Sequence, residues 1–269
     1  MIEFECRPKI MGIVNVTPDS FSDGGQYHDT QHAIDHALQL ADHGADILDV
    51  GGESTRPYSK PVETKEEIER VIPVISEIAK RTSVPISIDT SKAEVAKAAI
   101  DCGAEIINDV TGLEGDPAML DVALKTGAGV CVMHMQGNPQ NMQDNPMYEN
   151  VTEEISSYLQ RRFETLVAGG IKPEKICLDP GIGFGKTHEH NFDLLRNSHK
   201  FLNLGRPILV GHSRKGFIGK AIGDKEANRD FGTLAVSINL AKQNIHVLRV
   251  HNVEATKHGF DLWYKIEAM

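Results

Sequence analysis

Short apolar segments that are typical of buried strands alternate with amphipathic segments along the whole chain. The strand-like runs lie at 10–16, 46–51, 84–88, 104–108, 129–134, 175–179, 207–210 and 246–250. Helical spacing of apolar residues recurs between them, at 30–43, 64–78, 91–102, 117–126, 151–168, 189–198 and 228–243, and in a final helix that carries Phe260, Trp263 and Ile266. Buried strands joined by helices lie parallel, with right-handed crossovers. The pattern therefore predicts one α/β domain over residues 1–269.

Polar residues gather just after these strands, and their position favours one α/β architecture over another. They are Asn15, Glu53, Ser54, Thr55, Arg56, Asp89, Asn108, His134, Asp179, Ser213, Arg214, Lys215, Arg249 and His251. A closed barrel brings all the strand ends together on one face, whereas an open doubly wound sheet spreads them along an edge. We therefore expect a (β/α)8 TIM barrel, with the open sheet as the competing fold.

Local signals predict where some helices begin and where the chain is irregular. Thr64 with Glu67, and Ser91 with Glu94, have the spacing of a capping box, so each pair is expected to open a helix. The stretch 136–150 is rich in Asn, Gln and Pro, which predicts a long flexible loop at the face that holds the polar strand ends.

Composition limits the classes of partner. The formal net charge of −10 disfavours binding to nucleic acid or to an acidic membrane surface. No segment has the apolar length of a membrane span, and the first residues do not form a signal peptide, so we expect a cytoplasmic protein. The four cysteines are widely spaced without a CxxC pair, which indicates reduced structural thiols.

Two carboxylates and an amide at strand ends indicate what the site could bind. Ionised Asp89 and Asp179 only accept hydrogen bonds, so when buried they require a ligand with N–H donors or a cation. A guanidine-like edge of a heterocycle meets this requirement, and Asn108 could both donate and accept beside it. Lys215 and Arg249 could bond a ring carbonyl or stack on its face. Alternatively, each carboxylate could cap a helix or pair with a neighbouring base.

A second group of strand-end residues suits an anion. Asn15, Thr55, Arg56, Arg249 and His251 combine amide, hydroxyl and cationic donors, which are typical of a phosphate or pyrophosphate site. The loop that follows the first strand adds further hydroxyls and carboxylates. The site therefore has two parts, and a heterocyclic diphosphate would satisfy both of them.

Two other motifs do not meet their requirements. The run 181–187, GIGFGKT, is similar to a phosphate-binding P-loop, but Pro180 occupies the place of the first glycine, so we interpret it as a glycine-rich turn. The His-Glu-His run at 188–190 lacks the spacing of a zinc-binding helix.

Seven motifs in order resemble the dihydropteroate synthase family. They are MGIVNVTPDSFSDGG at 11–25, GGESTRP at 51–57, SIDTSK at 87–92, INDV at 107–110, LDPGIGFGK at 178–186, SRK at 213–215 and RVH at 249–251. The resemblance implies a homodimeric (β/α)8 transferase of folate biosynthesis. Such enzymes condense 6-hydroxymethyl-7,8-dihydropterin diphosphate with 4-aminobenzoate, giving 7,8-dihydropteroate and pyrophosphate, and sulfonamides compete with 4-aminobenzoate.

The resemblance also implies roles for individual residues. The pterin is expected among Asp89, Asn108, Asp179 and Lys215, with Arg249 against its ring. The diphosphate is expected near Thr55, Arg56, Arg249 and His251, with Mg²⁺ at Asn15, and 4-aminobenzoate near Phe21, Pro57, Ser213 and Lys215. Asp89, Asp179, Lys215 and Arg249 are the residues expected to act in the chemical step.

The ligands themselves suggest a mechanism without a covalent intermediate on the protein. Departure of pyrophosphate leaves a cation that the pterin ring delocalises, and the neutral arylamine then attacks, so no obligatory general base is expected. Three alternatives remain open on the sequence: a pterin-binding methyltransferase barrel, an isomerase or aldolase barrel, and a noncatalytic pterin-binding module. The diphosphate residues weigh against the first, and the position of Lys215, beyond a strand, weighs against the second.

Overall fold

A computed structural model describes residues 7–16, 25–224 and 226–267, with side chains in the first helix described from residue 30 onward. Its parallel strands are β1 Lys9–Asn15, β2 Ile47–Gly51, β3 Ile86–Asp89, β4 Ile106–Asp109, β5 Gly129–Met133, β6 Ile176–Asp179, β7 Leu209–Val210 and β8 Val247–Val250. They are hydrogen-bonded in the order β6-β5-β4-β3-β2-β1-β8-β7. A parallel bridge between Leu178 and Ile208 joins the two outer strands. The predicted TIM barrel is confirmed.

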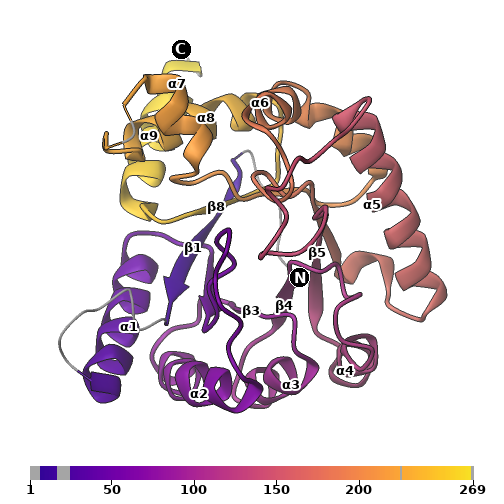
Figure 1. Cartoon of the computed structure of the whole chain (residues 1–269). Helices are drawn as coiled ribbons and strands as arrows, with labels where there is room; N and C mark the ends of the chain where they lie inside the picture. The colour runs from indigo at the N-terminus through magenta and orange to yellow at the C-terminus, as the bar shows by residue number, and fades with distance from the viewer. Residues whose placement is uncertain (1–6, 17–24, 225, 268–269) are drawn as a thin grey trace.

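Helices surround the strands (Figure 1). They are α1 Gly25–Asp42, α2 Thr64–Arg81, α3 Ala93–Asp101, α4 Met119–Thr126, α5 Val151–Ala168, α6 His188–Arg196, α7 Gly216–Ile222, α8 Asp230–Lys242 and α9 Val253–Glu267, with 3₁₀ turns at Pro173–Lys175 and Ser198–Leu204. Helix α7 was not predicted from the sequence, because it is short and contains two glycines, which lower helix propensity. Within the described residues, no helix is long and apolar enough to cross a membrane.

The strands separate an outer apolar layer from the barrel interior. Outward side chains such as Leu48 and Ile88 belong to the main core, which they share with helix residues such as Ile75. A second, smaller cluster lies on the alternate positions and consists of Met11, Ile47, Cys131, Leu209 and Val247, with Ile106 and Cys177 packed against it. Because successive side chains of a strand point to opposite sides, these residues fill the interior.

On several strands, the residue two positions after the apolar interior residue also points inward, and it is polar. Asp49 follows Ile47 on β2, and Arg249 follows Val247 on β8 at the same two-residue step. The same step places Asn108 after Ile106, and Asp179 after Cys177. The barrel therefore carries a layer of polar side chains directly above its apolar filling, at the carboxyl ends of the strands.

The two capping boxes expected from the sequence are wrong. The N-cap residues of α2 and α3 are Glu63 and Lys92, and neither helix has a side-chain cap at that position. Instead, Asp116 supports the start of α3: its Oδ2 accepts from the Ala93 N–H at 2.8 Å, while its Oδ1 accepts from the Ala118 N–H at 2.9 Å. Asp116 lies in the next loop of the barrel, so local sequence spacing could not reveal this cap.

We predict that Asp116→Ala lowers the free energy of unfolding by about 1–2 kcal/mol, since two backbone N–H groups lose their acceptor. Ser91→Ala is the matched control and should change stability by less than about 0.5 kcal/mol. Urea denaturation of both variants measures the difference. An equal loss of stability in the two variants would support the capping box that the sequence predicts at Ser91.

Candidate active site

The residues expected to bind ligand are brought together at the carboxyl ends of the barrel strands. Asn15, Asp89 and Asp179 are the last residues of β1, β3 and β6. Asn108 lies next to Asp89 in the register of β3 with β4. Lys215 directly precedes α7, and Arg249 lies in β8.

Arg249 links two carboxylates at this end of the barrel. Its Nε donates to Asp49 Oδ2 at 2.5 Å, and its Nη2 donates to Asp89 Oδ2 at 2.6 Å. Asn108 Nδ2 donates to the same Asp49 oxygen at 3.1 Å. Asp49 is fully buried, and its other oxygen, Oδ1, has no hydrogen-bond partner among the described residues. One guanidinium is thus shared by two acids.

Sequence analysis did not single out Asp49. The available signal was a carboxylate between Leu48 and Val50 in an otherwise apolar strand. Such a residue is either paired inside the protein or functional, because an isolated buried charge is very costly. Here it both orients Arg249 and holds the side-chain amide of Asn108.

Charge in this cluster is not balanced. Burial raises the pKa of Asp89 to about 7; the Arg249 guanidinium opposes this effect, and the negative charge of Asp49 adds to it. Burial alone would lower the pKa of Arg249, but Asp49 and Asp89 raise it above its ordinary value. Two acids facing one base leave hydrogen-bond acceptors available, so the cluster favours a ligand that carries N–H donors.

Asp179 and Lys215 form the opposite wall. Asp179 is buried, and its Oδ1 accepts from the Gly181 N–H at 2.7 Å. Lys215 Nζ donates to the Ile182 carbonyl and lies 4.3 Å from the centre of the Phe184 ring. Burial lowers the pKa of Lys215 to about 7, although Asp179 opposes the shift. Phe184 was not predicted as a site residue, because a single aromatic residue in a glycine-rich turn carries no clear signal.

Ser213 and His251 are joined at the ends of β7 and β8. His251 Nδ1 lies 2.9 Å from Ser213 Oγ, and the His251 N–H donates to the same oxygen at 3.2 Å. Burial, together with the positive charges of Arg214 and Arg249, lowers the pKa of His251 to about 3. His251 is therefore a neutral hydrogen-bonding group at pH 7 and does not contribute a cation.

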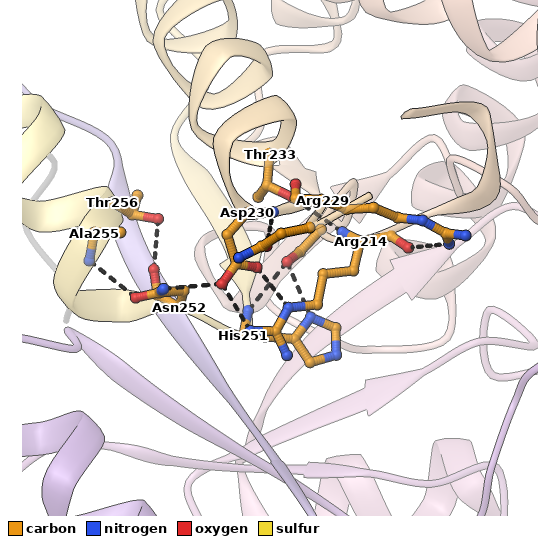
Figure 2. Close-up of polar contacts among 10 residues, drawn as sticks. Arg214, Arg229, Asp230, Thr233, His251, Asn252, Ala255 and Thr256 are labelled. Atoms are coloured by element: carbon orange, nitrogen blue, oxygen red, sulfur yellow. Dashed lines mark hydrogen bonds and ion pairs between the residues drawn. The ribbon is translucent and has the colours of Figure 1, made fainter. Parts of the chain in front are cut away.

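Ion pairing behind this contact ties the two loops together, as Figure 2 shows. Arg214 donates to both oxygens of Asp230, at 2.6 and 2.9 Å, and Asn252 Nδ2 donates to Asp230 Oδ2 at 3.0 Å. Arg214 has a left-handed backbone with φ of 57°. A bidentate pair of this kind fixes orientation well, so Ser213 and Lys215, on either side of Arg214, are held in place.

The loop after β2 carries Thr55, Arg56 and Pro57, and it is anchored from below. Glu53 and the fully buried Glu67 both accept from Lys92 Nζ. Thr55 is half-buried, whereas Arg56 and Pro57 are exposed. A cavity of about 160 Å³ lies beside Asp89 and is lined by Thr55 and Gln140 among others.

The predicted loop at 136–150 forms one side of this cavity. It contains no helix or strand and is joined to the loop after β2 by a bond from the Tyr58 N–H to the Pro139 carbonyl at 3.0 Å. Phe21, expected in the same region, lies outside the described residues.

Comparison with known proteins places this site in a family. Residues 11–251 match the family described as pterin binding enzyme. Dihydropteroate synthase of Escherichia coli strain K12 is 47% identical over 250 residues, which cover 93% of this chain and 88% of that protein.

Solved structures agree. The Yersinia pestis dihydropteroate synthase with a sulfonamide drug has a TM-score of 0.91 and 41% identity, covering 98% of this chain and 95% of that one. The Xanthomonas albilineans enzyme in complex with 7,8-dihydropteroate has a TM-score of 0.88 and 39% identity, with the same two coverages.

We predict that Asp49→Ala costs about 3 kcal/mol of unfolding free energy, because it breaks an ion pair whose carboxylate is fully buried and leaves part of the half-buried Arg249 guanidinium unpaired. It should also reduce turnover at least tenfold, since Arg249 is no longer oriented. Asp46→Ala is the control: Asp46 pairs with Arg7 at 2.7 Å at the opposite end of β2. That variant should lose stability and keep wild-type turnover per folded molecule. Denaturation and steady-state kinetics test both variants, and full activity in Asp49→Ala would refute the orienting role.

Proposed function

The chain belongs to the dihydropteroate synthase family, and from that premise we propose that its pterin substrate binds on Asp89, Asn108 and Asp179. The enzyme condenses 6-hydroxymethyl-7,8-dihydropterin diphosphate with 4-aminobenzoate and releases pyrophosphate. The observation that carries the assignment is that two carboxylates, Asp49 and Asp89, share the single guanidinium of Arg249. The amino and ring N–H groups of a pterin supply the missing donors.

Lys215 and Arg249 complete the pterin site. The Lys215 ammonium is placed to donate to the ring carbonyl, while the Arg249 guanidinium, fixed by Asp49, lies against the ring face. Phe184 adds an aromatic wall beside Lys215. These contacts fix the orientation of the ring relative to the strand ends.

The diphosphate lies on the other side of the site. Thr55 and Arg56 from the loop after β2 offer a hydroxyl and a cation, and Arg249 offers a second cation. With the Ser213 hydroxyl donating to Nδ1, the neutral His251 ring carries its proton on Nε2 and adds a donor there. The charge of the leaving group is thus met by the two arginines.

The residues present fit a magnesium ion held mainly by the substrate. Mg²⁺ takes few protein oxygens and keeps phosphate and water ligands, and the side-chain amide oxygen of Asn15 at the end of β1 is one suitable oxygen. In the described ranges, no three His, Cys, Asp or Glu side chains gather to form a metal site of their own. When bound, the ion would neutralise charge on the diphosphate, which helps it to leave.

The arylamine site is proposed beside these two. Pro57, Ser213 and Lys215, together with Phe21, are the candidates to hold 4-aminobenzoate, and sulfonamides would bind there in its place. The protein acts mainly by positioning and by electrostatics. Each donor to the leaving group could lower the barrier by roughly 2.7–4 kcal/mol, and Asp89 and Asp179 stabilise the cationic pterin left behind. The neutral arylamine then attacks without an obligatory general base.

Two alternative functions differ from the synthase in what they require of the site. A methyltransferase barrel has no use for Thr55, Arg56 and His251 as a diphosphate site. A noncatalytic pterin-binding module would bind the ring and release nothing. Both alternative functions are disfavoured, because candidate residues for both halves of the diphosphate substrate are present in one chain.

We predict that the purified protein releases pyrophosphate only when pterin diphosphate, 4-aminobenzoate and Mg²⁺ are all supplied, with one dihydropteroate formed per pyrophosphate. Asp179→Asn should lower kcat/KM by tenfold or more, because it removes a charged acceptor for the ring. A coupled pyrophosphate assay and chromatography of the product measure both quantities. Tight pterin binding without pyrophosphate release would support the binding module instead.

We also propose that the enzyme is a homodimer formed through α7, α8 and α9. These adjacent helices (Figure 1) carry four of the eight large apolar side chains that are exposed in the described chain, namely Ile222, Phe231, Leu262 and Ile266. Phe231 alone is 79% exposed. A twofold dimer would cover such a patch on both copies at once. The single domain at 1–269 and the cytoplasmic location remain predictions.

Phe231→Glu is expected to convert the dimer to a monomer, since the added charge cannot be buried at the interface. Leu124→Glu is the matched control, because Leu124 is 40% exposed on α4, away from these helices. Sedimentation equilibrium of both variants over a range of concentrations decides the question. A Phe231→Glu variant that sediments as the wild type does would exclude this interface.

A further inference from the structure

Lys186 is a charged residue buried where no proposed substrate contact reaches it. Its side chain is among the largest fully buried ones, and the residue is only 2% exposed. Lys186 Nζ lies 3.0 Å from His134 Nδ1, 3.3 Å from the His134 carbonyl oxygen and 2.8 Å from the Phe184 carbonyl oxygen. Burial lowers the pKa of Lys186, whereas the negative charge of Asp179 opposes that shift. In its ammonium form the side chain has three N–H donors, and these three contacts satisfy all of them. The residue is therefore neither a surface lysine nor a phosphate-binding one.

The turn that contains Lys186 lies directly on the turn after β5. Gly181 and Gly185 have φ of 68° and 64°. A Cβ at Gly181 would be 2.0 Å from the His134 carbonyl oxygen, and one at Gly185 would be 2.4 Å from the Gln136 carbonyl oxygen. The glycines thus permit a contact between two backbones, and Lys186 joins the two turns by bonding to both.

The same turn forms one wall of the proposed pterin site. Gly181 bonds Asp179 Oδ1, the Ile182 carbonyl accepts from Lys215, and the Phe184 ring lies under the Lys215 ammonium. Lys186 holds this wall from the rear, through the Phe184 carbonyl oxygen. A shift of the turn would move three contacts of the site together.

We propose that Lys186 is a positioning residue of the pterin site, which fixes the turn after β6 that carries Phe184 and bonds the Asp179 carboxylate through the Gly181 N–H. The inference rests on the proposed binding of the pterin at Asp179. Lys186 touches neither substrate. Its effect passes through Asp179 and through the turn that carries Phe184.

The surroundings of Asp179 give the charge a measurable role. The groups that face it are Lys215 from the start of α7, Lys186 from its own turn, Arg249 from β8 and the Cys131 thiol from β5. Burial raises the pKa of Asp179, whereas Lys215, Lys186 and Arg249 oppose the rise. Loss of the Lys186 charge therefore raises this pKa further. Asp179 then becomes protonated at a higher pH and no longer accepts two hydrogen bonds from the ring.

Lys186→Met tests the proposal through the binding of two separate probes between pH 5 and 9. The first probe is 6-hydroxymethyl-7,8-dihydropterin, and the second is inorganic pyrophosphate with Mg²⁺. We expect pterin binding to be at least tenfold weaker at pH 7, and its acidic limb to move up by about one pH unit or more, as for loss of a nearby opposite charge. Pyrophosphate binding should change less than about twofold, because its proposed contacts lie on other loops.

Two further variants separate the contribution of the Lys186 hydrogen bonds from that of its charge. Lys186→Gln can restore a donor to the Phe184 carbonyl oxygen without restoring charge, so it should recover part of the affinity and retain the shifted acidic limb. Lys172→Met removes an exposed lysine just before β6 and should match the wild type in every measurement. A wild-type pH profile in Lys186→Met, or an equal loss of pterin and pyrophosphate binding, would overturn the proposal.

A double variant covers the case in which Lys186→Met does not fold. Asp179→Asn with Lys186→Met removes two buried groups of opposite charge that interact electrostatically, a change that is better tolerated than removal of one of them. It should bind the pterin as weakly as Asp179→Asn alone and show the same pH profile. A further tenfold loss in the double variant would mean that Lys186 does not act through Asp179. A wild-type chain that binds pyrophosphate but no pterin would refute the assigned pterin site and this inference with it.

Discussion

The sharing of Arg249 between Asp49 and Asp89 is the interaction on which the site depends. Two buried carboxylates cannot both be compensated by one guanidinium, so the site retains acceptors that a ligand must satisfy. This imbalance is costly to the folded protein, and in the proposed complex the N–H donors of the pterin would satisfy the acceptors that remain. Asp49 fixes the Arg249 guanidinium, which the proposed substrate would contact.

Several loops around this cluster are supported by charged residues that lie behind them. Lys92 is bound by Glu53 and Glu67 beneath the loop after β2. Asp230 receives Arg214 and Asn252 behind the turns after β7 and β8, and Lys186 holds the turn after β6. Binding groups on loops are less precise than groups on strands unless a second set of contacts supports them. The enzyme meets this need with ion pairs and buried lysines.

The arrangement also explains why one barrel can serve as a synthase without a covalent nucleophile. The proposed pterin contacts Asp89, Asn108 and Asp179 come from strand ends that the barrel closure makes rigid, whereas the proposed diphosphate contacts Thr55 and Arg56 come from a loop. Arg249, in β8, serves both the pterin and the diphosphate in this proposal. A neutral His251 and a Lys215 of lowered pKa fit this division, since both act as positioned donors in a partly dry site.

The sequence by itself determined the architecture and several of the polar residues that meet at one end of the barrel, because strand and helix periods are local and the carboxyl ends of barrel strands must converge. Asp89, Asn108, Asp179 and Arg249 could be found in this way, and the family followed from the motifs around them. Only the tertiary structure decided the partners: Asp49 with Arg249, Asp116 with α3, and Lys186 with the turns after β5 and β6. These contacts join segments far apart in the chain, and their energies depend on burial, which no local pattern of residues specifies.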